Sequence, residues 1–362
     1  MSSIRFEGRA SRAPNVCVIV LNWNNWRDTE VCLQSIRESN YPNSSIIVLD
    51  NGSRDDSWRD LQEWILKEKL DHECQDLPLS GGSSEKSNTP SETSVQFDTS
   101  TKSLCGRWLI LRSAENLGFA GGVNACIVKA FDLAAIYVML LNNDARLPPN
   151  AISRLVEIEE STGAGAVGAT ILNGLGSEVL FGGAQWPATM FWGGKSLLSS
   201  RPNLPDVLPS DDVNGAACMF RASLLERRVK EEGFALDPDF FMYCEETDLC
   251  RYVIESGHQC FLACNVRVPH GLARSSGGVG NPRSYYYLSR NKVRLAKRWL
   301  SGLWRVAFTV YYIPSRIVLV LIKLFSGRFA VAAAINEGVI DGYLRRTGKW
   351  RKHDRNSVEF DS

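Results

Sequence analysis

The stretch VCVIVLNWNNWRDTEVCLQSIRESNYPNSSIIVLDNGS, residues 16–53, decides the fold. Residues 16–21 form a short, β-branched apolar run, and residues 46–49 form a second one. Between them, over residues 31–36, apolar residues recur at helical spacing. Strand, helix and strand in this order make a βαβ unit, and such units build parallel sheets. Polar residues follow both strands, at the edge where open α/β sheets bind their ligands.

The same alternation of strand and helix patterns continues along the chain. We therefore expect an α/β domain over residues 15–282, with a Rossmann-like, mostly parallel sheet flanked by helices and preceded by a tail at residues 1–14. Within it, residues 72–103 are rich in Ser, Thr and Gly and predict a flexible insertion in a surface loop. The further predicted strands are residues 108–111, 137–141, 166–172 and 259–268.

Composition narrows the class of protein. The chain has 362 residues, of which 44% are apolar and 22% charged, so disordered, collagen-like and disulfide-scaffold proteins are excluded. Ten cysteines are scattered without CxxC spacing, and residues 1–14 lack the apolar run of a secretory signal. These features predict reduced, mostly buried thiols in the cytosol.

Charge is distributed unevenly. The net charge is +1, but residues 283–362 hold 16 Lys and Arg against 5 Asp and Glu, a net charge of +11, so the remainder carries −10. Anionic lipid and nucleic acid are the usual partners of such a basic segment. Because the basic residues are interleaved with a long apolar run, the pattern favours an anionic membrane surface over nucleic acid.

Residues 283–362 predict a basic, amphipathic helical segment. A basic, aromatic helix covers residues 285–300, and residues 306–325 are mostly apolar with Pro314 and Arg316 near the middle. A spanning helix needs about 20 apolar residues, and a central Arg costs roughly 2.5–3.5 kcal/mol on insertion scales. We therefore expect two short helices, hinged at Pro314, in the membrane interface. A spanning helix and a soluble hydrophobic helical pair are the alternatives.

Asp144 and His270 are candidate metal ligands. Asp144 ends a predicted buried strand after Asn142 and Asn143, and a hard divalent cation prefers such oxygen ligands. His270 follows another predicted strand, and its imidazole can serve the same ion. The alternative readings are an ordinary polar turn at the first position and a structural histidine at the second.

Three acidic residues, Glu245, Glu246 and Asp248, begin a predicted helix. The aromatic residues at 240–243 place these acids at a partly apolar cleft edge, where burial raises a carboxyl pKa toward the range of a general base. The alternative is that the three acids cap the helix and are stabilised by its dipole.

Asp50 and the glycine-rich residues 118–122 complete the candidate set. Asp50 can accept a hydrogen bond from a pyrimidine base, and the glycines let the backbone approach a diphosphate. A glycine-rich turn by itself is weak evidence for phosphate binding.

Six blocks in this order resemble the inverting family 2 glycosyltransferases, which have the GT-A fold. The resemblance covers about residues 15–300. Within the family, the chain looks most similar to the bacterial rhamnosyltransferase branch, which elongates cell-surface polysaccharides on lipid carriers. The blocks are VIVLNWN (18–24), LDNGSRD (49–55), ENLGFAGGVN (115–124), LLNND (140–144), EETDLCR (245–251) and His270.

The resemblance implies a role for each matching position. Glu246 occupies the place of the catalytic base, Asp144 that of the metal-binding acid in an Asp-x-Asp site, and His270 that of a later metal ligand. The implied ion is Mg²⁺ or Mn²⁺. The implied acceptor-binding positions are Gly215, Ala216 and Glu245, and the implied nucleotide-sugar-binding positions are Asn22, Asp50, Asn116, Gly118, Gly121, Gly122 and Asn143.

Two positions depart from the family pattern. Asn142 stands where many members have the first Asp of Asp-x-Asp, which removes one charge and weakens the expected hold on a metal. Glu246 replaces the commoner Asp and extends the carboxylate by one methylene, so the distance to the acceptor must adjust. Neither change removes the chemistry.

The resemblance implies a metal-dependent inverting transferase at the cytoplasmic, inner face of the cell membrane. It would move a sugar, with dTDP-rhamnose the expected donor, to a lipid-linked saccharide in cell-surface polysaccharide synthesis. A UDP-sugar-dependent transferase of the same fold and a catalytically inactive binding module are alternatives. A sugar nucleotidyltransferase is a further one, although it usually has a Gly-rich loop with Arg and Lys where this chain has Asn22–Asn25.

Overall fold

The computed structural model describes residues 13–78, 106–186, 195–197, 205–271 and 280–350. The strands of the main sheet are β1 (Val16–Asn22), β2 (Ser44–Asn51), β3 (His72–Asp76), β4 (Trp108–Ser113), β5 (Tyr137–Asn142), β6 (Ala166–Asn173), β7 (Val179–Phe181), β10 (Val207–Ser210), β11 (Ala217–Arg221) and β12 (Cys260–His270). A separate two-stranded ribbon consists of β8 (Ala184–Gln185) and β9 (Lys195–Ser196).

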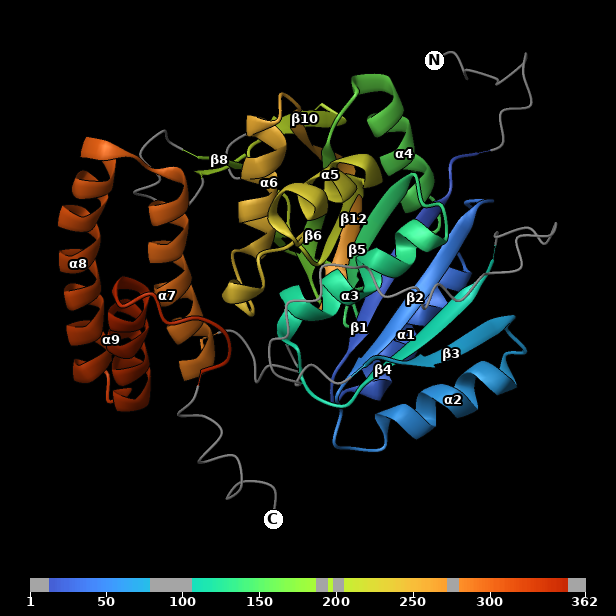
Figure 1. The fold of residues 1–362 in the computed structure, drawn as a ribbon, viewed down its shortest axis with the longest axis horizontal. Coiled ribbons are helices and arrows are strands. Elements are labelled where there is room, and N and C mark those ends of the chain that lie inside the picture. Colours follow the sequence, from blue (N-terminus) through green and yellow to red (C-terminus); the bar gives the residue numbers. More distant parts are fainter. Residues whose placement is uncertain (1–12, 79–105, 187–194, 198–204, 272–279, 351–362) are drawn as a thin grey trace.

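The main sheet is mostly parallel, as the βαβ pattern predicts. Its strand order is β10-β12-β6-β11-β5-β1-β2-β4-β3, with β7 paired to β6 (Figure 1). The strands β5, β1, β2, β4 and β3 all run parallel, whereas β11 is antiparallel between β5 and β6. The expected α/β fold class is confirmed.

Helices cover both faces of the sheet and form a separate layer at one edge of the molecule (Figure 1). They are α1 (Trp26–Arg37), α2 (Ser57–Lys67), α3 (Gly118–Asp132), α4 (Ala151–Thr162), α5 (Ala222–Glu232), the 3₁₀ helix η1 (Pro238–Phe240), α6 (Glu245–Glu255), α7 (Pro282–Trp299), α8 (Gly302–Phe325) and α9 (Phe329–Tyr343).

The sheet separates two hydrophobic cores because its strands bury side chains on both faces. Along β1, Val16, Val18 and Val20 pack on one side with α1, α2 and α4. Cys17 and Ile19 alternate with them and pack on the other side with α3, α5 and α6. Apolar runs of this kind are expected where helices cover both faces of a sheet. The polar residues that end the strands therefore gather at its carboxyl edge.

The C-terminal helices α7, α8 and α9 form the layer at the edge of the sheet domain (Figure 1). Val293 and Ala296 of α7 and Phe308 and Tyr312 of α8 share one small buried cluster. Helix α9 crosses α7 closely at Gly338, where a Cβ atom would collide with the Tyr286 carbonyl oxygen.

The expected hinge at Pro314 is wrong, because α8 is one continuous helix of 24 residues with that proline inside it. A proline removes a single N–H donor, and here contacts with α7 hold the helix on both sides of it. The Tyr312 hydroxyl donates to the Ser289 carbonyl oxygen (3.0 Å), and the Lys323 ammonium lies 5.2 Å from the centre of the Tyr285 ring.

By length and composition, α8 is the one helix in the described ranges that could cross a membrane, and little of it is buried. One such helix is weak evidence for a membrane span, because core helices of soluble proteins pass the same test.

The segment predicted as a flexible insertion begins with ordered structure. Residues His72–Asp76 form β3, which pairs in parallel with β4 at the edge of the sheet. The pairing was not expected because this strand is largely polar. Residues 79–105, most of the predicted insertion, and residues 1–12 of the predicted tail lie outside the described residues.

Candidate active site

The carboxyl ends of β1, β5 and β12 open onto one cavity of about 380 Å³. The start of α3, the residues before α6 and the first turn of α7 form the rest of its wall. Asp144 and Glu246, which come from distant parts of the sequence, both line it. The sequence-predicted positions on this wall are Asn116, Gly118, Asn143, Asp144, Gly215, Ala216, Glu245, Glu246 and His270.

Asn22 and Asp50 lie at the ends of β1 and β2 but are not on the cavity wall. The Thr29 hydroxyl donates to Asn22 Oδ1 (2.7 Å), and the Ser53 amide and hydroxyl donate to Asp50. Burial raises the pKa of Asp50, and the hydrogen bonds from Ser53 oppose that rise. Both side chains thus hold the loops that follow their strands.

Gly121 and Gly122 lie within α3 and likewise do not line the cavity. A Cβ atom on Gly122 would lie 3.1 Å from Leu21 Cδ1, and one on Gly121 would lie 3.2 Å from Leu117 Cβ. Gly122 therefore allows α3 to pack closely on the sheet. Its expected contact with a diphosphate remains a prediction.

Asp144 and His270 meet at the end of β5. Asp144 Oδ1 lies 2.9 Å from His270 Nε2, and Asn142 Nδ2 lies 3.1 Å from the same nitrogen. The other carboxylate oxygen, Asp144 Oδ2, is buried and has no hydrogen-bond partner. A buried carboxylate oxygen beside an imidazole fits a divalent cation that keeps most of its ligands from water or phosphate.

No group of three or more His, Cys, Asp or Glu side chains that could hold a metal occurs in the described part of the chain. Asp144 and His270 would therefore supply two ligands, and oxygen atoms of a substrate phosphate would have to supply others. Asn142, at the position where many family members have an acid, contacts the His270 ring. A contact of this kind, from a side chain behind a metal ligand, orients that ligand.

Glu245 and Glu246 begin α6, as the sequence predicts, and both face the cavity. Burial raises the pKa of Glu245 well above its ordinary value, and the charge of Glu246 raises it further. Burial also raises the pKa of Glu246, whereas its own backbone N–H and that of Gly215 lower it. Glu246 Oε2 is buried without a hydrogen-bond partner. Such a carboxyl group suits proton transfer near neutral pH.

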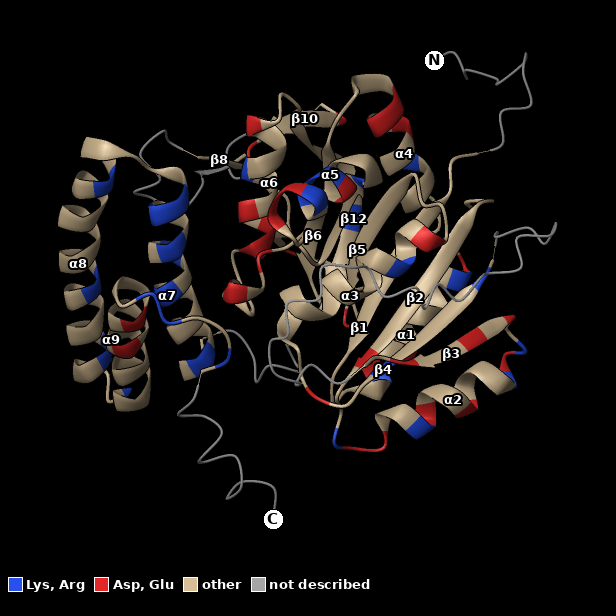
Figure 2. Ribbon diagram, viewed as in Figure 1, with Lys and Arg blue, Asp and Glu red and all other residues tan. Residues whose placement is uncertain are grey.

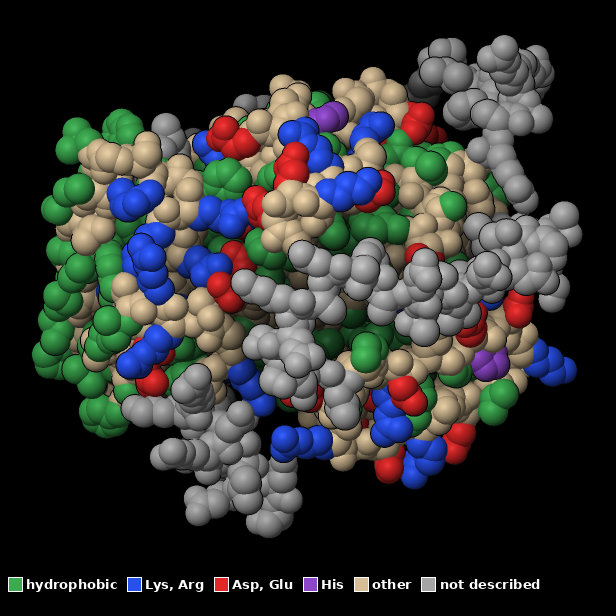
Figure 3. Space-filling view, in the orientation of Figure 1, with side chains coloured by type: hydrophobic (Ala, Val, Ile, Leu, Met, Phe, Trp, Pro, Cys, Tyr) green, Lys and Arg blue, Asp and Glu red, His purple; other side chains and the backbone are tan. Residues whose placement is uncertain are grey.

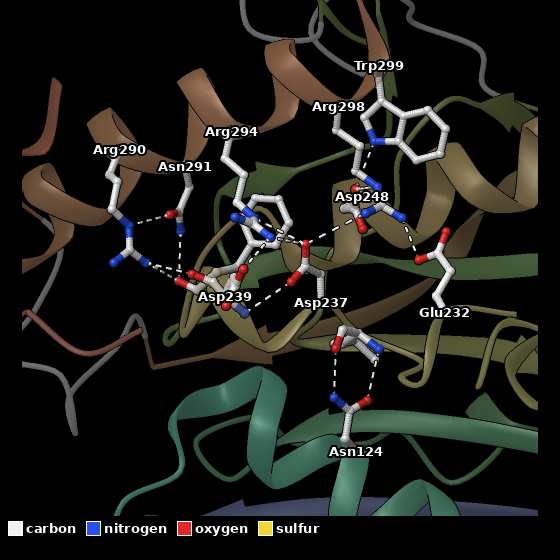
Figure 4. A network of polar contacts seen from close by, with 12 residues as sticks. Asn124, Glu232, Asp237, Asp239, Asp248, Arg290, Asn291, Arg294, Arg298 and Trp299 are labelled. Atoms are coloured by element: carbon white, nitrogen blue, oxygen red, sulfur yellow. Dashed lines mark hydrogen bonds and ion pairs between the residues drawn. The ribbon is translucent and has the colours of Figure 1, made fainter. Parts of the chain in front are cut away.

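The third acid of this group, Asp248, is not part of the cavity. It is fully buried, and it accepts hydrogen bonds from Arg228 and from Trp299 Nε1 (2.8 Å). Arg228 contacts Oδ2, whereas Trp299 donates to Oδ1, from which Arg298 Nε also lies 2.9 Å. Asp248 therefore joins α6 to α5 and α7 (Figure 4).

The glycine-rich loop before α3 is fixed from two sides. Asn51 accepts from the Leu117 amide (3.0 Å) and donates to the Gly118 carbonyl oxygen (3.0 Å). Gly118 has a φ of +75°, and a Cβ atom there would lie 2.6 Å from the Phe241 carbonyl oxygen. That same oxygen accepts from the Phe119 amide (2.7 Å). The Phe119 amide in the first turn of α3 is thus bound to the loop that precedes Glu245.

That loop has an unusual backbone, with positive φ at Phe241, Tyr243 and Cys244. Buried Asn291 of α7 places its Nδ2 within 3.0 Å of three loop carbonyl oxygens, those of residues 240, 242 and 243. Arg290, also buried, donates to the carbonyl oxygens of residues 239 and 240 (Figure 4). Helix α7 therefore holds the strained loop from which the two glutamates emerge.

Sequence reasoning missed several residues of this site. Arg283 lines the cavity from the first turn of α7, and its guanidinium lies 5.0 Å from the centre of the Trp23 ring. Among the described residues that line the cavity, it is the one Lys or Arg. The signal was the sequence Asn281-Pro282 before it, since Asn281 caps α7 and Pro282 occupies its first turn.

Comparison with known protein families identifies the family of this chain. The profile described as Glycosyl transferase family 2 matches residues 17–76 and 88–229, more than half of the chain. The chain belongs to glycosyltransferase family 2. The matched region includes Asp144 and Gly215 but ends before Glu246 and His270. A search of curated protein sequences finds no match.

Solved glycosyltransferases share the fold of this family 2 chain at low sequence identity. One is the mannosyltransferase PcManGT from Pyrobaculum calidifontis in complex with GDP-Man and Mn²⁺, with a TM-score of 0.53 and 13% identity over 92% of this chain and 88% of that one. Another is GalNAc-T7 with UDP, GalNAc and Mn²⁺, with a TM-score of 0.52 and 14% identity over 77% of this chain. The match covers 48% of GalNAc-T7, about half its length. These likenesses establish the GT-A fold.

Proposed function

We propose that the protein transfers a sugar from a nucleotide diphosphate donor to an acceptor hydroxyl with inversion at the anomeric carbon. The observation that carries this proposal is one cavity in which Asp144, with an unpartnered buried oxygen, and Glu246 are both present. One protein with the same fold has been solved with GDP-Man and Mn²⁺ and another with UDP, GalNAc and Mn²⁺, which supports a nucleotide diphosphate donor and a divalent metal.

The donor diphosphate would lie between Asp144 and Arg283. Asp144 and His270 would hold Mg²⁺ or Mn²⁺, and the ion would stabilise the negative charge of the departing diphosphate as a Lewis acid. Arg283 would add a second positive charge, because it is the guanidinium on this wall and stacks on Trp23. Together these groups would favour departure of the nucleotide.

Glu246 would accept the proton of the attacking hydroxyl. Its raised pKa, caused by burial, brings the carboxylate closer to the basicity that general-base catalysis needs. The new glycosidic bond forms at the anomeric carbon as the bond to the diphosphate breaks, and the proton passes to Glu246. Direct displacement inverts the configuration and needs no covalent sugar–enzyme intermediate. Gly215, Ala216 and Glu245 would contact the acceptor.

The test is the substitution Glu246→Gln. It keeps the size of the side chain but removes the base, so transfer should fall by about 10²–10⁴-fold. Donor binding, measured as thermal stabilisation by nucleotide sugar with Mn²⁺, should be retained. The matched control is Glu255→Gln, at the other end of α6, where the carboxylate is solvent-exposed and pairs with Arg251. Near-normal transfer by Glu246→Gln, or an equal loss in the control, would contradict the assignment.

The donor sugar is proposed from the family resemblance. We expect dTDP-rhamnose, with UDP-galactofuranose and UDP-glucose as the next candidates. A panel of nucleotide sugars with Mn²⁺ decides among them, because a tight ligand raises the melting temperature by mass action. The donor should give the largest shift, and that shift should diminish when the metal is chelated.

The acceptor is proposed to be a lipid-linked glycan at the cytoplasmic face of the membrane. Exposed apolar side chains recur along one side of α8 and cover the edge of the molecule (Figure 3). Helix α8 would lie in the interface and bring the cavity to the lipid. The exposed side chains of this stripe, here called the α8 apolar face, are Leu303, Val306, Val310, Ile313, Ile317, Leu321 and Leu324.

A further inference from the structure

A second cavity, of about 320 Å³, lies between α7, the end of α9 and the start of α8. None of its described lining residues belongs to the active-site cavity. Seven of the nine are cationic, and Figure 2 shows Lys and Arg recurring along α7. The cationic residues of this cavity, here called the basic pocket, are Arg290, Arg294, Lys297, Arg298, Arg305, Arg345 and Arg346.

Part of this positive charge is neutralised within the protein. Arg294 Nη2 lies 2.6 Å from Asp237, and Arg298 pairs with Asp248. The Arg346 guanidinium lies 2.9 Å from an Asp341 oxygen. These pairs account for three of the seven cations. Arg290 donates to carbonyl oxygens of residues 239, 240 and 348 and stacks against two tyrosine rings.

The other three cations have no carboxylate partner in the described part of the chain. Lys297 Nζ donates to the carbonyl oxygens of Gly342 (3.0 Å) and Tyr343 (2.9 Å). Arg305 donates only to carbonyl oxygens at the end of α7. Arg345 is exposed just past the end of α9, with no ion pair to a described residue. Three cations without a carboxylate partner among the described residues thus converge on one cavity.

The proximity of these cations has an electrostatic consequence at Lys297. Burial lowers the pKa of its ammonium group, and the charges of Arg345 and Arg305 lower it further. An anion in the cavity would relieve this repulsion. A phosphate group suits the cavity, because several Arg and Lys donors converge and phosphate accepts them at its oxygens.

The position of the basic pocket indicates where such a phosphate would come from. Arg305 belongs to the first turns of α8, and Leu303 and Val306 beside it in sequence begin the α8 apolar face. The basic pocket thus lies at the start of the helix that carries the apolar face, and a lipid, whose acyl chains adjoin its phosphate, matches the two features together.

We propose that the basic pocket binds the phosphate group of an anionic membrane lipid. Lys297, Arg305 and Arg345 contact the headgroup, while the α8 apolar face enters the interface beside it. The site is separate from the donor cavity, so it fixes the orientation of the enzyme on the membrane without taking part in transfer. This inference rests on the membrane part of the proposed function.

The test compares binding to vesicles of phosphatidylcholine alone and of phosphatidylcholine with phosphatidylglycerol, by co-sedimentation of the full chain. Arg345→Glu reverses a charge in the pocket at an exposed position, so it should fold normally. Binding to the anionic vesicles should fall by about 10–30-fold, as expected for one lost attraction and one new repulsion. Binding to neutral vesicles through the α8 apolar face should be unchanged.

Two controls separate the pocket from general surface charge. Lys69→Glu makes the same charge change at an exposed residue that also has a positive φ (52°, against 59° for Arg345) just past a helix, but far from α8 in sequence. Lys323→Glu makes it within α8, outside the pocket. Each should weaken binding to anionic vesicles clearly less than Arg345→Glu does.

Equal losses for Arg345→Glu and Lys323→Glu would overturn the pocket and leave a diffuse surface attraction. Unchanged vesicle binding by Arg345→Glu, together with loss of thermal stabilisation by inorganic pyrophosphate, would also overturn it, because the site would then serve a soluble phosphate. Donor turnover in solution is the separate readout of the catalytic proposal. Arg345→Glu should leave it at the wild-type rate, so failure of one proposal is not mistaken for failure of the other.

Discussion

The two walls of the active-site cavity, one with Asp144 and the other with Glu246, are held in place by different kinds of contact. On the Asp144 wall, the functional side chain comes two residues after the end of β5, whose backbone is paired with parallel β1 on one side and antiparallel β11 on the other. On the Glu246 wall, the loop before the functional side chain has three non-glycine residues at positive φ. That loop is held by side chains of α7 rather than by a sheet.

This difference indicates how the two walls respond to change. A strand end keeps its position when one side chain is altered, because the hydrogen bonds of the sheet involve only the backbone. A loop held by a few side-chain hydrogen bonds moves when one of them is lost. Substitutions on the first wall should therefore alter chemistry alone, and those behind the second wall should alter geometry.

Of the three substitutions that compare the walls here, Asp144→Asn on the sheet wall is expected to have the largest effect. The substitution removes the charge that would hold the metal, so transfer should fall by about 10²–10³-fold, the worth of several kcal/mol of Lewis-acid stabilisation. Kinetics as a function of Mn²⁺ concentration measure this. The melting temperature should stay near that of the parent, and Asp132→Asn on α3 is the control. A large loss of stability in Asp144→Asn would contradict the view that substitutions on the sheet wall alter chemistry alone.

A smaller effect, of a different kind, is expected from Asn291→Ala behind the second wall. Buried carbonyl oxygens of the loop lose their donor, which costs roughly 1–3 kcal/mol of stability. Glu246 then shifts, and a shift of about 1 Å can cost up to 10²-fold in rate. We expect kcat to fall while donor binding is retained.

Asn336→Ala is the control for that substitution, because Asn336 is an exposed residue of α9 in the same helical layer. If Asn291→Ala lowers stability but leaves kcat unchanged, α7 supports the fold without positioning the base. If Asn291→Ala weakened donor binding by the same factor as it lowered kcat, the two walls would not be independent.

The smallest effect is expected on the pH dependence of stability, through the buried carboxyl group of Asp212. Burial raises the pKa of Asp212 to about 8, and the charge of nearby Glu246 contributes to the rise. The folded state therefore binds a proton more tightly than the unfolded state, and stability should fall as pH rises from about 4 to about 8. Asp212→Asn should flatten that fall and raise the stability at pH 8.

Thermal unfolding across this pH range measures the effect. The amide still accepts from Thr247 and Trp186, the present donors to Asp212 Oδ2. Asp206→Asn, at an exposed acid before β10, should leave the pH profile unchanged. A profile for Asp212→Asn as steep as that of the parent would show that other acids, such as Glu159, dominate the slope.

The sheet and its polar edge could be predicted from sequence because the signals are local. The apolar run of β1 and the residues Asn142-Asn143-Asp144 at the end of β5 can be recognised without knowledge of distant parts of the chain. The start of α6 at Glu245 was predicted for the same reason. The meeting of Asp144 and His270 at one edge of the sheet followed from the geometry of strand ends, whereas the place of Glu246 beside them was implied only by the family resemblance.

The remaining features depend on contacts that sequence patterns do not report. Arg283 reaches the cavity only because α7 begins beside Trp23, and Asn291 acts on a loop about 50 positions away. The continuous α8 was missed because contacts with α7 offset the local effect of Pro314. In each case tertiary packing supplies the information.

The close approach of Gly118 to the Phe241 carbonyl oxygen has a consequence for engineering. Here a chimera with a crossover anywhere between positions 118 and 241 would inherit the two partners from different parents. Only parents that both keep glycine at the first position, and the same backbone turn at the second, can be recombined in this way without a clash.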